Sequence, residues 1–166
     1  MHIIVFVYGT LKRGQWNHDR FCGYAIDTRP ATIVGRLYDL PAGFPALEVP
    51  EAAILATGTD DPLADAVTQA RLAERDLNMP VVTGDWDVVH GELVTFADPA
   101  RDLPPLDRLE GFRPDGGGLY RRALAATEAN RGVETAWVYH MARVHQGERL
   151  RGGTWPLPGV GDVVGH

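Results

Sequence analysis

The chain has 166 residues, of which 45% are hydrophobic and 23% charged, and its formal net charge is −6. These values predict one globular domain over residues 1–166. The acidic balance excludes a nucleic-acid surface, which needs a basic face, and disfavours an anionic membrane as partner. The single cysteine, Cys22, excludes an intramolecular disulfide and a cysteine-based zinc site. No apolar run reaches the ~20 residues of a membrane span. The first apolar run has no basic leader, so we expect a cytoplasmic protein.

The first predicted element is a buried strand over residues 3–7, which is rich in β-branched and aromatic residues. It leads into Tyr8-Gly9-Thr10-Leu11-Lys12-Arg13-Gly14. Gly9 allows either a positive φ or a close approach of the backbone to a ligand. Free N–H groups after such a strand can form a small anion-binding concavity. The same residues also fit an ordinary connection from a strand to a helix. A phosphate loop is excluded, because its other glycines and its Lys-Ser/Thr ending are missing.

A short helix or turn is predicted over residues 15–22, with Trp16 packing inward. Asn17-His18 is either a helix cap or a part of the site. A strand over 31–40 follows, and the proline-rich residues 41–47 predict a turn. Phe44 in this turn is either a cavity wall or a core residue.

A helix is predicted to start at Asp61-Pro62, because aspartate caps helices well and proline suits the first helical position. Its expected buried face is an apolar stripe at roughly helical spacing, formed by Leu63, Val67, Ala70, Leu72 and Leu77.

Residues 87–96 alternate between polar and apolar side chains, which predicts another strand. It carries Glu92, a candidate acid that either points into a cavity or is solvated or ion-paired. A short helix is predicted over 104–112, with prolines in its first turn and Gly111 near its end. It carries Glu110, which on its own fits a solvated carboxylate at a helix end.

The last predicted strand covers residues 135–140, and a loop-like tail follows from residue 146, with Trp155 as its anchor. The histidines His140, His145 and His166 show no metal-ligand spacing, so we predict no metal site.

Two segments resemble the γ-glutamylcyclotransferase-like family, and most closely its γ-glutamylamine cyclotransferase branch. The first is the motif at residues 8–14 together with Asn17-His18. The second is Leu106-Asp107-Arg108-Leu109-Glu110 followed by Tyr120-Arg121-Arg122, which is similar to the family pattern Leu-Asp-x-Ø-Glu and Tyr-x-Arg, where Ø is a bulky apolar residue. The resemblance covers residues 3–50 and 86–142. It implies an α+β fold with a mixed, barrel-like β-sheet and short flanking helices, which the order of the predicted elements also fits.

The resemblance also implies a function. The chain would be a cofactor-free enzyme that cyclises the γ-glutamyl group of a γ-glutamyl amine or peptide to 5-oxoproline and releases the amine. Glu110 matches the family's catalytic acid/base. The implied substrate-binding residues are Tyr8, Gly9, Thr10 and Leu11, through their backbone amides, and Tyr120, which either donates a hydroxyl hydrogen bond or is a core residue. The connection is shorter in compact family members, so residues 52–80 are expected to be an insertion.

Several alternatives stay open. A non-catalytic small-molecule binding protein could share the fold and the anion-binding loop. A related enzyme could remove a γ-glutamyl protecting group from a biosynthetic intermediate, which changes only the leaving group. Residues 52–80 are a plain surface helix, a lid, a stiffener of the surface or a dimer contact. The oligomeric state and the pathway stay open.

Overall fold

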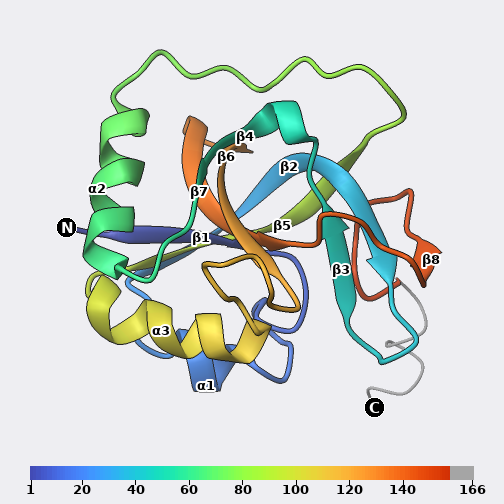
Figure 1. The fold of residues 1–166 in the computed structure, drawn as a ribbon, viewed down its shortest axis with the longest axis horizontal. Coiled ribbons are helices and arrows are strands. Elements are labelled where there is room, and N and C mark those ends of the chain that lie inside the picture. Colours follow the sequence, from blue (N-terminus) through green and yellow to red (C-terminus); the bar gives the residue numbers. More distant parts are fainter. Residues whose placement is uncertain (158–166) are drawn as a thin grey trace.

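The computed structural model describes residues 1–157, so Pro158 and His166 of the expected tail lie outside it. At its centre is a closed, five-stranded barrel (Figure 1). Its strands, in the order around the barrel, are β1 (Ile3–Val7), β5 (Asp87–Phe96), β2 (Asp27–Asp39), β6 (Arg121–Ala129) and β7 (Gly132–His140). All neighbours are antiparallel except β7 and β1, which are parallel and close the barrel.

Shorter strands and helices surround the barrel. The strands are β3 (Pro45–Glu48) and β8 (Glu148–Arg149), both paired with β2, and β4 (Ile54–Thr57), paired with β6. The helices are α1 (His18–Cys22), a 3-10 turn at Glu51–Ala53, α2 (Pro62–Ala73) and α3 (Pro99–Glu110). The predicted α+β fold with a mixed, barrel-like sheet and short flanking helices is confirmed. Within residues 1–157 no helix has the length and apolar character needed to cross a membrane.

The alternation of side chains along the strands divides the core into two clusters. Ile3, Val5 and Val7 on one face of β1 pack in a cluster that includes Leu106 of α3. Phe6 on the opposite face packs with residues of β2, β5 and β7. Strand β1 is therefore held on both faces, and this fixes the point from which the following loop leaves the barrel.

The strand predictions hold well where a strand is long and central. Residues 3–7 and 87–96 form strands with the predicted bounds. The strand predicted at 31–40 begins earlier, at Asp27, and the strand predicted at 135–140 begins at Gly132. The turn predicted over 41–47 is too long, because Pro45–Leu47 pair with β2 as part of β3.

The predicted start of α3 is wrong, since the helix begins at Pro99 and has Pro104 and Pro105 in its interior. The start is set by Asp98, whose side chain accepts a hydrogen bond from the backbone N–H of Arg101 at 3.2 Å. The internal prolines remove two helical donors. The residues one turn earlier are exposed, so water can bind their free carbonyls.

Helix α2 begins as predicted but packs through a different face. Its N-cap is Asp61, whose side chain accepts hydrogen bonds from two backbone N–H groups at 3.1 Å. Ala66 is buried, and the buried Gln69 side chain accepts a hydrogen bond from the backbone N–H of Ile4 at 2.9 Å. A small residue thus lets the helix approach the barrel, and a side-chain amide oxygen accepts a backbone N–H of β1. The predicted apolar stripe is wrong, because its first three members are exposed and the others half-buried: Leu63, Val67, Ala70, Leu72 and Leu77.

Candidate functional site

The predicted binding loop leaves the barrel directly after β1. Gly9 has no positive φ, but a Cβ on it would lie 2.5 Å from Cγ of Pro45. The positive φ is therefore not used, and the glycine allows the loop to pack closely against Pro45. Its close approach to a ligand stays a prediction. Within residues 1–157 the backbone N–H groups of Gly9, Thr10 and Leu11 donate to no other protein group. The loop thus keeps three backbone donors free.

Side-chain contacts hold this loop in place. Asn17 donates through Nδ2 to Oγ1 of Thr10 at 2.9 Å, and its backbone N–H donates to the Thr10 carbonyl at 3.0 Å. Glu92 accepts from the backbone N–H of Arg13 at 2.7 Å and from its Nε at 2.8 Å. These two bonds hold Arg13 of the loop in place. Glu92 itself lines a second, smaller cavity of about 230 Å³.

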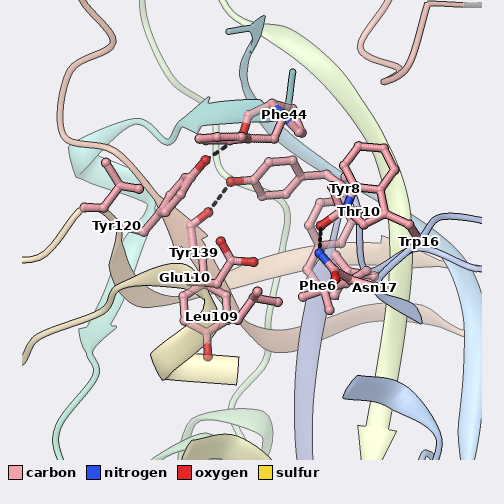
Figure 2. Close-up of a pocket in the computed structure, with 15 residues that line it drawn as sticks. Phe6, Tyr8, Thr10, Trp16, Asn17, Phe44, Leu109, Glu110, Tyr120 and Tyr139 are labelled. Carbon is pink, nitrogen blue, oxygen red and sulfur yellow. Dashed lines mark hydrogen bonds between the residues drawn. The ribbon is translucent and has the colours of Figure 1, made fainter. Parts of the chain in front are cut away.

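Glu110 is the last residue of α3, and the chain turns away immediately after it. Gly111 is left-handed, with φ of 65°, and the backbone N–H of Phe112 donates to the Asp107 carbonyl at 2.8 Å. Figure 2 shows the Glu110 carboxylate pointing into a cavity, with Tyr120 on one side and Thr10 on the other. Within the described chain no hydrogen bond or ion pair engages this carboxylate. Glu110 is thus a half-buried acid whose carboxylate faces the cavity.

The cavity has a volume of about 290 Å³ and is lined by fifteen residues, which places it near the lower end of the size range of small-molecule sites. The lining includes every predicted site residue: Tyr8, Gly9, Thr10, Leu11, Glu110 and Tyr120. It also includes Phe44, which is thus a wall of the cavity. No residue of 52–80 lines it, so α2 does not act as its lid in this structure.

Burial gives these lining groups different protonation behaviour. It raises the pKa of Glu110 from 4.5 to about 7. It also raises the pKa of the phenols of Tyr8 and Tyr120, which therefore stay neutral. Among the described residues that line the cavity, Glu110 is the one that gains or loses a proton near neutral pH.

The hydroxyl groups of two tyrosines form hydrogen bonds between residues that line the cavity. Tyr120 donates to the Pro45 carbonyl at 2.7 Å, and Tyr8 donates to the Tyr139 carbonyl at 2.6 Å. Both bonds join segments that line the cavity (Figure 2). The Tyr120 hydroxyl proton is thus engaged in a hydrogen bond within the protein. The Tyr120 side chain both lines the cavity and packs in the core.

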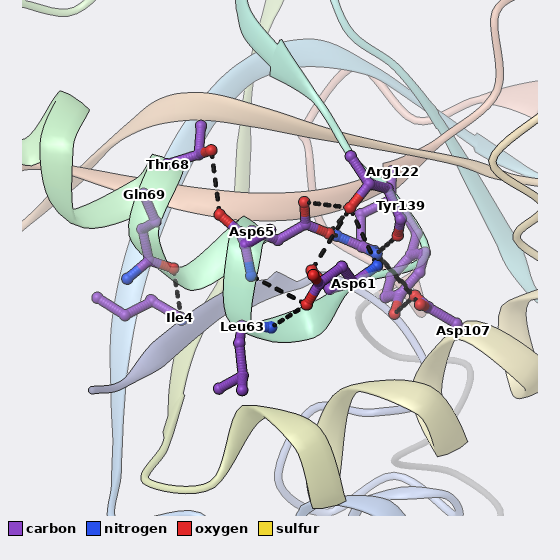
Figure 3. Close-up of polar contacts among 11 residues, drawn as sticks. Ile4, Asp61, Leu63, Asp65, Thr68, Gln69, Asp107, Arg122 and Tyr139 are labelled. Atoms are coloured by element: carbon purple, nitrogen blue, oxygen red, sulfur yellow. Dashed lines mark hydrogen bonds and ion pairs between the residues drawn. The ribbon is translucent and has the colours of Figure 1, made fainter.

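A buried ionic cluster joins β6 to α2 and α3 (Figure 3). Arg122 of β6 is 1% exposed and binds Asp65 of α2 at 2.9 Å and Asp107 of α3 at 2.8 Å. Tyr139 donates its hydroxyl to the same Asp107 at 2.6 Å. Since Asp107 precedes Glu110 by one helical turn, these bonds fix the end of α3 that carries the acid.

Several lining residues were not predicted for the site. Trp16 was expected to pack inward, but it is exposed, and its ring meets that of Trp155 edge-on at 5.8 Å between centroids. Trp155 anchors the tail as expected, since it is buried and its Nε1 donates to Asp39 at 2.9 Å. Tyr139 also lines the cavity, and the only signal for it was its alternation with Trp137 in the last strand.

Residues 1–157 hold no group of three or more acidic, histidine or cysteine side chains arranged for a metal.

The comparisons with known proteins come from sequence and from structure. The model of the family described as gamma-glutamyl cyclotransferase, AIG2-like, matches residues 5–59 and 51–157. The structure resembles YkqA from Bacillus subtilis, with a TM-score of 0.56, 19% identity and coverage of 93% of this chain and 40% of that one. The chain thus spans less than half of the length of that protein. An uncharacterised protein from Pyrococcus horikoshii gives a TM-score of 0.50, 16% identity and coverage of 92% and 89%. Both likenesses are evidence of a shared fold. A search of curated proteins gives no match.

Proposed function

The chain belongs to the gamma-glutamyl cyclotransferase, AIG2-like family, and on this basis we propose that it cyclises a γ-glutamyl amine or peptide to 5-oxoproline and releases the amine. The observation that carries the proposal concerns the described residues, 1–157. Among them the Glu110 carboxylate has no hydrogen-bond or ion-pair partner, and it shares one cavity with the free backbone donors of residues 9–11. A general acid/base and an anion-binding loop are the two parts that this reaction needs.

The reaction is intramolecular. The α-amine nitrogen of the γ-glutamyl group attacks its own γ-carbonyl carbon, a five-membered lactam closes, and the bond from that carbon to the leaving nitrogen breaks. The reacting atoms are already in one molecule, so the protein has to fold the substrate and move one proton. In this proposal Glu110 takes the proton from the attacking amine and gives it to the leaving nitrogen. No oxidant, reductant or co-reactant is needed for this balance.

The cavity suits each group of this substrate. The N–H groups of Gly9, Thr10 and Leu11 would bind the α-carboxylate or the developing oxyanion. A pKa of about 7 allows Glu110 to act first as base and then as acid near neutral pH. Three further expectations from the sequence are part of the proposal. They are a cytoplasmic location, a single domain with residues 52–80 as an insertion, and a reaction that needs no cofactor.

The proposal is tested by incubating the protein with γ-glutamyl amines and γ-glutamyl dipeptides and measuring 5-oxoproline and free amine. We expect the two products in equal amounts. Compounds that bind but yield no 5-oxoproline would instead support the alternative, a non-catalytic binding protein on the same fold. Release of glutamate in place of 5-oxoproline would identify a hydrolase and overturn the proposed reaction.

A further inference from the structure

The turn that presents the free backbone donors ends at Lys12. The backbone N–H of Lys12 donates to the Gly9 carbonyl at 3.1 Å and closes the turn of residues 9–12. The Lys12 side chain reaches the C-terminal part of the chain, where its ammonium donates to the Trp155 carbonyl. Within residues 1–157 no carboxylate forms an ion pair with this ammonium, and burial lowers the pKa of Lys12. Lys12 thus joins the turn to a residue 143 positions away.

The segment that accepts this bond is itself fixed to the barrel. We call residues 148–155 the C-terminal strap. It begins as β8 beside β2, and the backbone N–H of Leu150 donates to a β2 carbonyl at 2.7 Å. Strand β5 holds its other end, because the backbone N–H of His90 donates to the Gly153 carbonyl at 2.7 Å. Gly153 has φ of 73°, and a Cβ on it would lie 1.9 Å from the Val88 carbonyl oxygen. The strap is therefore held closely by both strands.

Trp155 of the strap contacts the loop after β1 at two places. Its carbonyl accepts the Lys12 hydrogen bond, and its ring meets the Trp16 ring edge-on. The Trp155 ring is 4% exposed and its Nε1 donates to Asp39, so it is a fixed support. Trp16, by contrast, is 65% exposed and forms the rim of the cavity together with Leu119. The strap thus contacts both the end of the turn and the rim.

We propose that Lys12 and Trp155 are positioning residues, which hold the turn of residues 9–12 in one conformation beside the cavity. The three free N–H groups of this turn would bind a carboxylate or a developing oxyanion, and such donors act best when they need no reorganisation. A displacement of about 1 Å in a site can lower the rate about 10²-fold. The kinetic part of this inference rests on the proposed function and deepens it, whereas the order of the turn is measured without substrate.

The kinetic test removes the bond between the turn and the strap. Lys12→Met keeps the length of the side chain but has no donor, so kcat/KM for a γ-glutamyl amine should fall by about ten- to hundredfold. Lys12→Arg keeps a cationic donor and should retain most of the wild-type value. The matched control is Arg151→Met, which removes a cation from the same strap at a position where it binds Asp85. This control should leave kcat/KM unchanged.

A second variant separates positioning from the charge of Lys12. Trp155→Phe keeps an aromatic ring but lacks the Nε1 donor that binds Asp39, and it leaves the Lys12 charge in place. It should lower kcat/KM by about three- to tenfold. Combined with Lys12→Met it should add no further loss, because two residues that act through one contact are not additive. Circular dichroism at the assay temperature checks that each variant is folded.

The structural test uses the protein without substrate. In the wild type the backbone amides of Gly9, Thr10 and Leu11 should have ¹⁵N order parameters near the rigid value of about 0.85. In Lys12→Met these order parameters should fall toward about 0.6, where flexible backbone begins. In Arg151→Met they should stay as in the wild type.

The outcomes separate this inference from the proposed function. Equal kcat/KM of Lys12→Met and Arg151→Met, or unchanged order parameters in Lys12→Met, would overturn the inference. Fully additive losses in the double variant would overturn it as well, and would assign the effect of Lys12 to its charge. If the wild type forms no 5-oxoproline but the order parameters fall in Lys12→Met, the proposed function fails and the positioning of the turn stands.

Discussion

At the scale of single residues, the character of Glu110 follows from three local features. It ends a helix, the left-handed Gly111 turns the chain away behind it, and the walls of the cavity keep most water from it. None of these features adds a hydrogen-bond donor or a cation, so burial alone acts on its charge. The surroundings of Glu92 differ, because its carboxylate forms an ion pair with Arg13. The sequence offers both glutamates as candidate acids, and their surroundings in the structure distinguish them.

The raised pKa of Glu110 predicts a pH dependence of turnover. The carboxylate is the form that accepts a proton, so kcat/KM should rise about tenfold per pH unit at acidic pH and level off above pH 7. A carboxyl NMR titration without substrate separates Glu110 from the substrate amine. The signal that titrates near pH 7 should be missing in Glu110→Gln and present in Glu92→Gln. A signal titrating near 4.5 would contradict the environment described here.

The same pKa predicts that Glu110→Gln stabilises the protein at alkaline pH. A folded pKa of about 7 against 4.5 means that the stability contribution is complete below pH 4.5 and is lost as pH rises to 7. Above pH 7 the variant should therefore be more stable than the wild type, by up to about 3 kcal/mol. Urea denaturation at pH 5 and pH 8 measures this, and Glu92→Gln should show no such gain. Equal stabilities of variant and wild type at pH 8 would refute the prediction.

At the scale of elements, α2 belongs to the core through polar groups. Asp65 and Gln69 are buried, and they bind Arg122 of β6 and the backbone of Ile4 on β1. Through Arg122 and Asp107 the same cluster reaches the end of α3 (Figure 3). Helix α2, within residues 52–80, is therefore connected through Arg122 to the helix that carries Glu110.

This cluster predicts a stability loss for Asp65→Asn. The substitution removes one of the two anions of Arg122, and a hydrogen bond to a charged group contributes about 1.5–3 kcal/mol. The free energy of unfolding should fall by about that amount, since Asp107 remains as the second partner. Asp60→Asn is the control, because this exposed neighbour should change stability by no more than about 0.5 kcal/mol. Equal losses in the two variants would show that the buried pair has no special role.

The elements also show what a sequence can predict and what it cannot. The cap at Asp61-Pro62 and the end of α3 at Gly111 were predictable, because each depends on a few adjacent residues. The start of α3 has the same signal, an aspartate followed by a proline at Asp98-Pro99. The prediction placed the start at Pro104 instead, because prolines are common in the first turn of a helix. The buried face of α2 was not predictable, because Asp65 is buried by a partner 57 residues away. Apolar patterns do not reveal polar groups that are buried in pairs.

At the scale of the whole molecule, closure of the barrel creates the site. The parallel pair β1–β7 places the loop after β1 beside Tyr139. The neighbouring strand β6 carries Arg122, and Tyr120 directly precedes it. Two motifs that are far apart in the sequence thereby line one cavity (Figure 2). The motifs predicted which residues meet there. The exposed rim formed by Trp16 and Leu119 depends on loop packing, so the sequence did not indicate it.

The most direct test of the account is turnover of a γ-glutamyl amine by Glu110→Gln beside Glu92→Gln, with substrate binding measured separately. Glu110→Gln keeps the size and polarity of the side chain but cannot accept the proton. It should bind substrate and form 5-oxoproline about 10²–10⁴-fold more slowly than the wild type. Glu92→Gln should keep most of the turnover, because its carboxylate lies outside the main cavity. Wild-type turnover by Glu110→Gln, or an exchange of the two outcomes, would contradict the role assigned to Glu110.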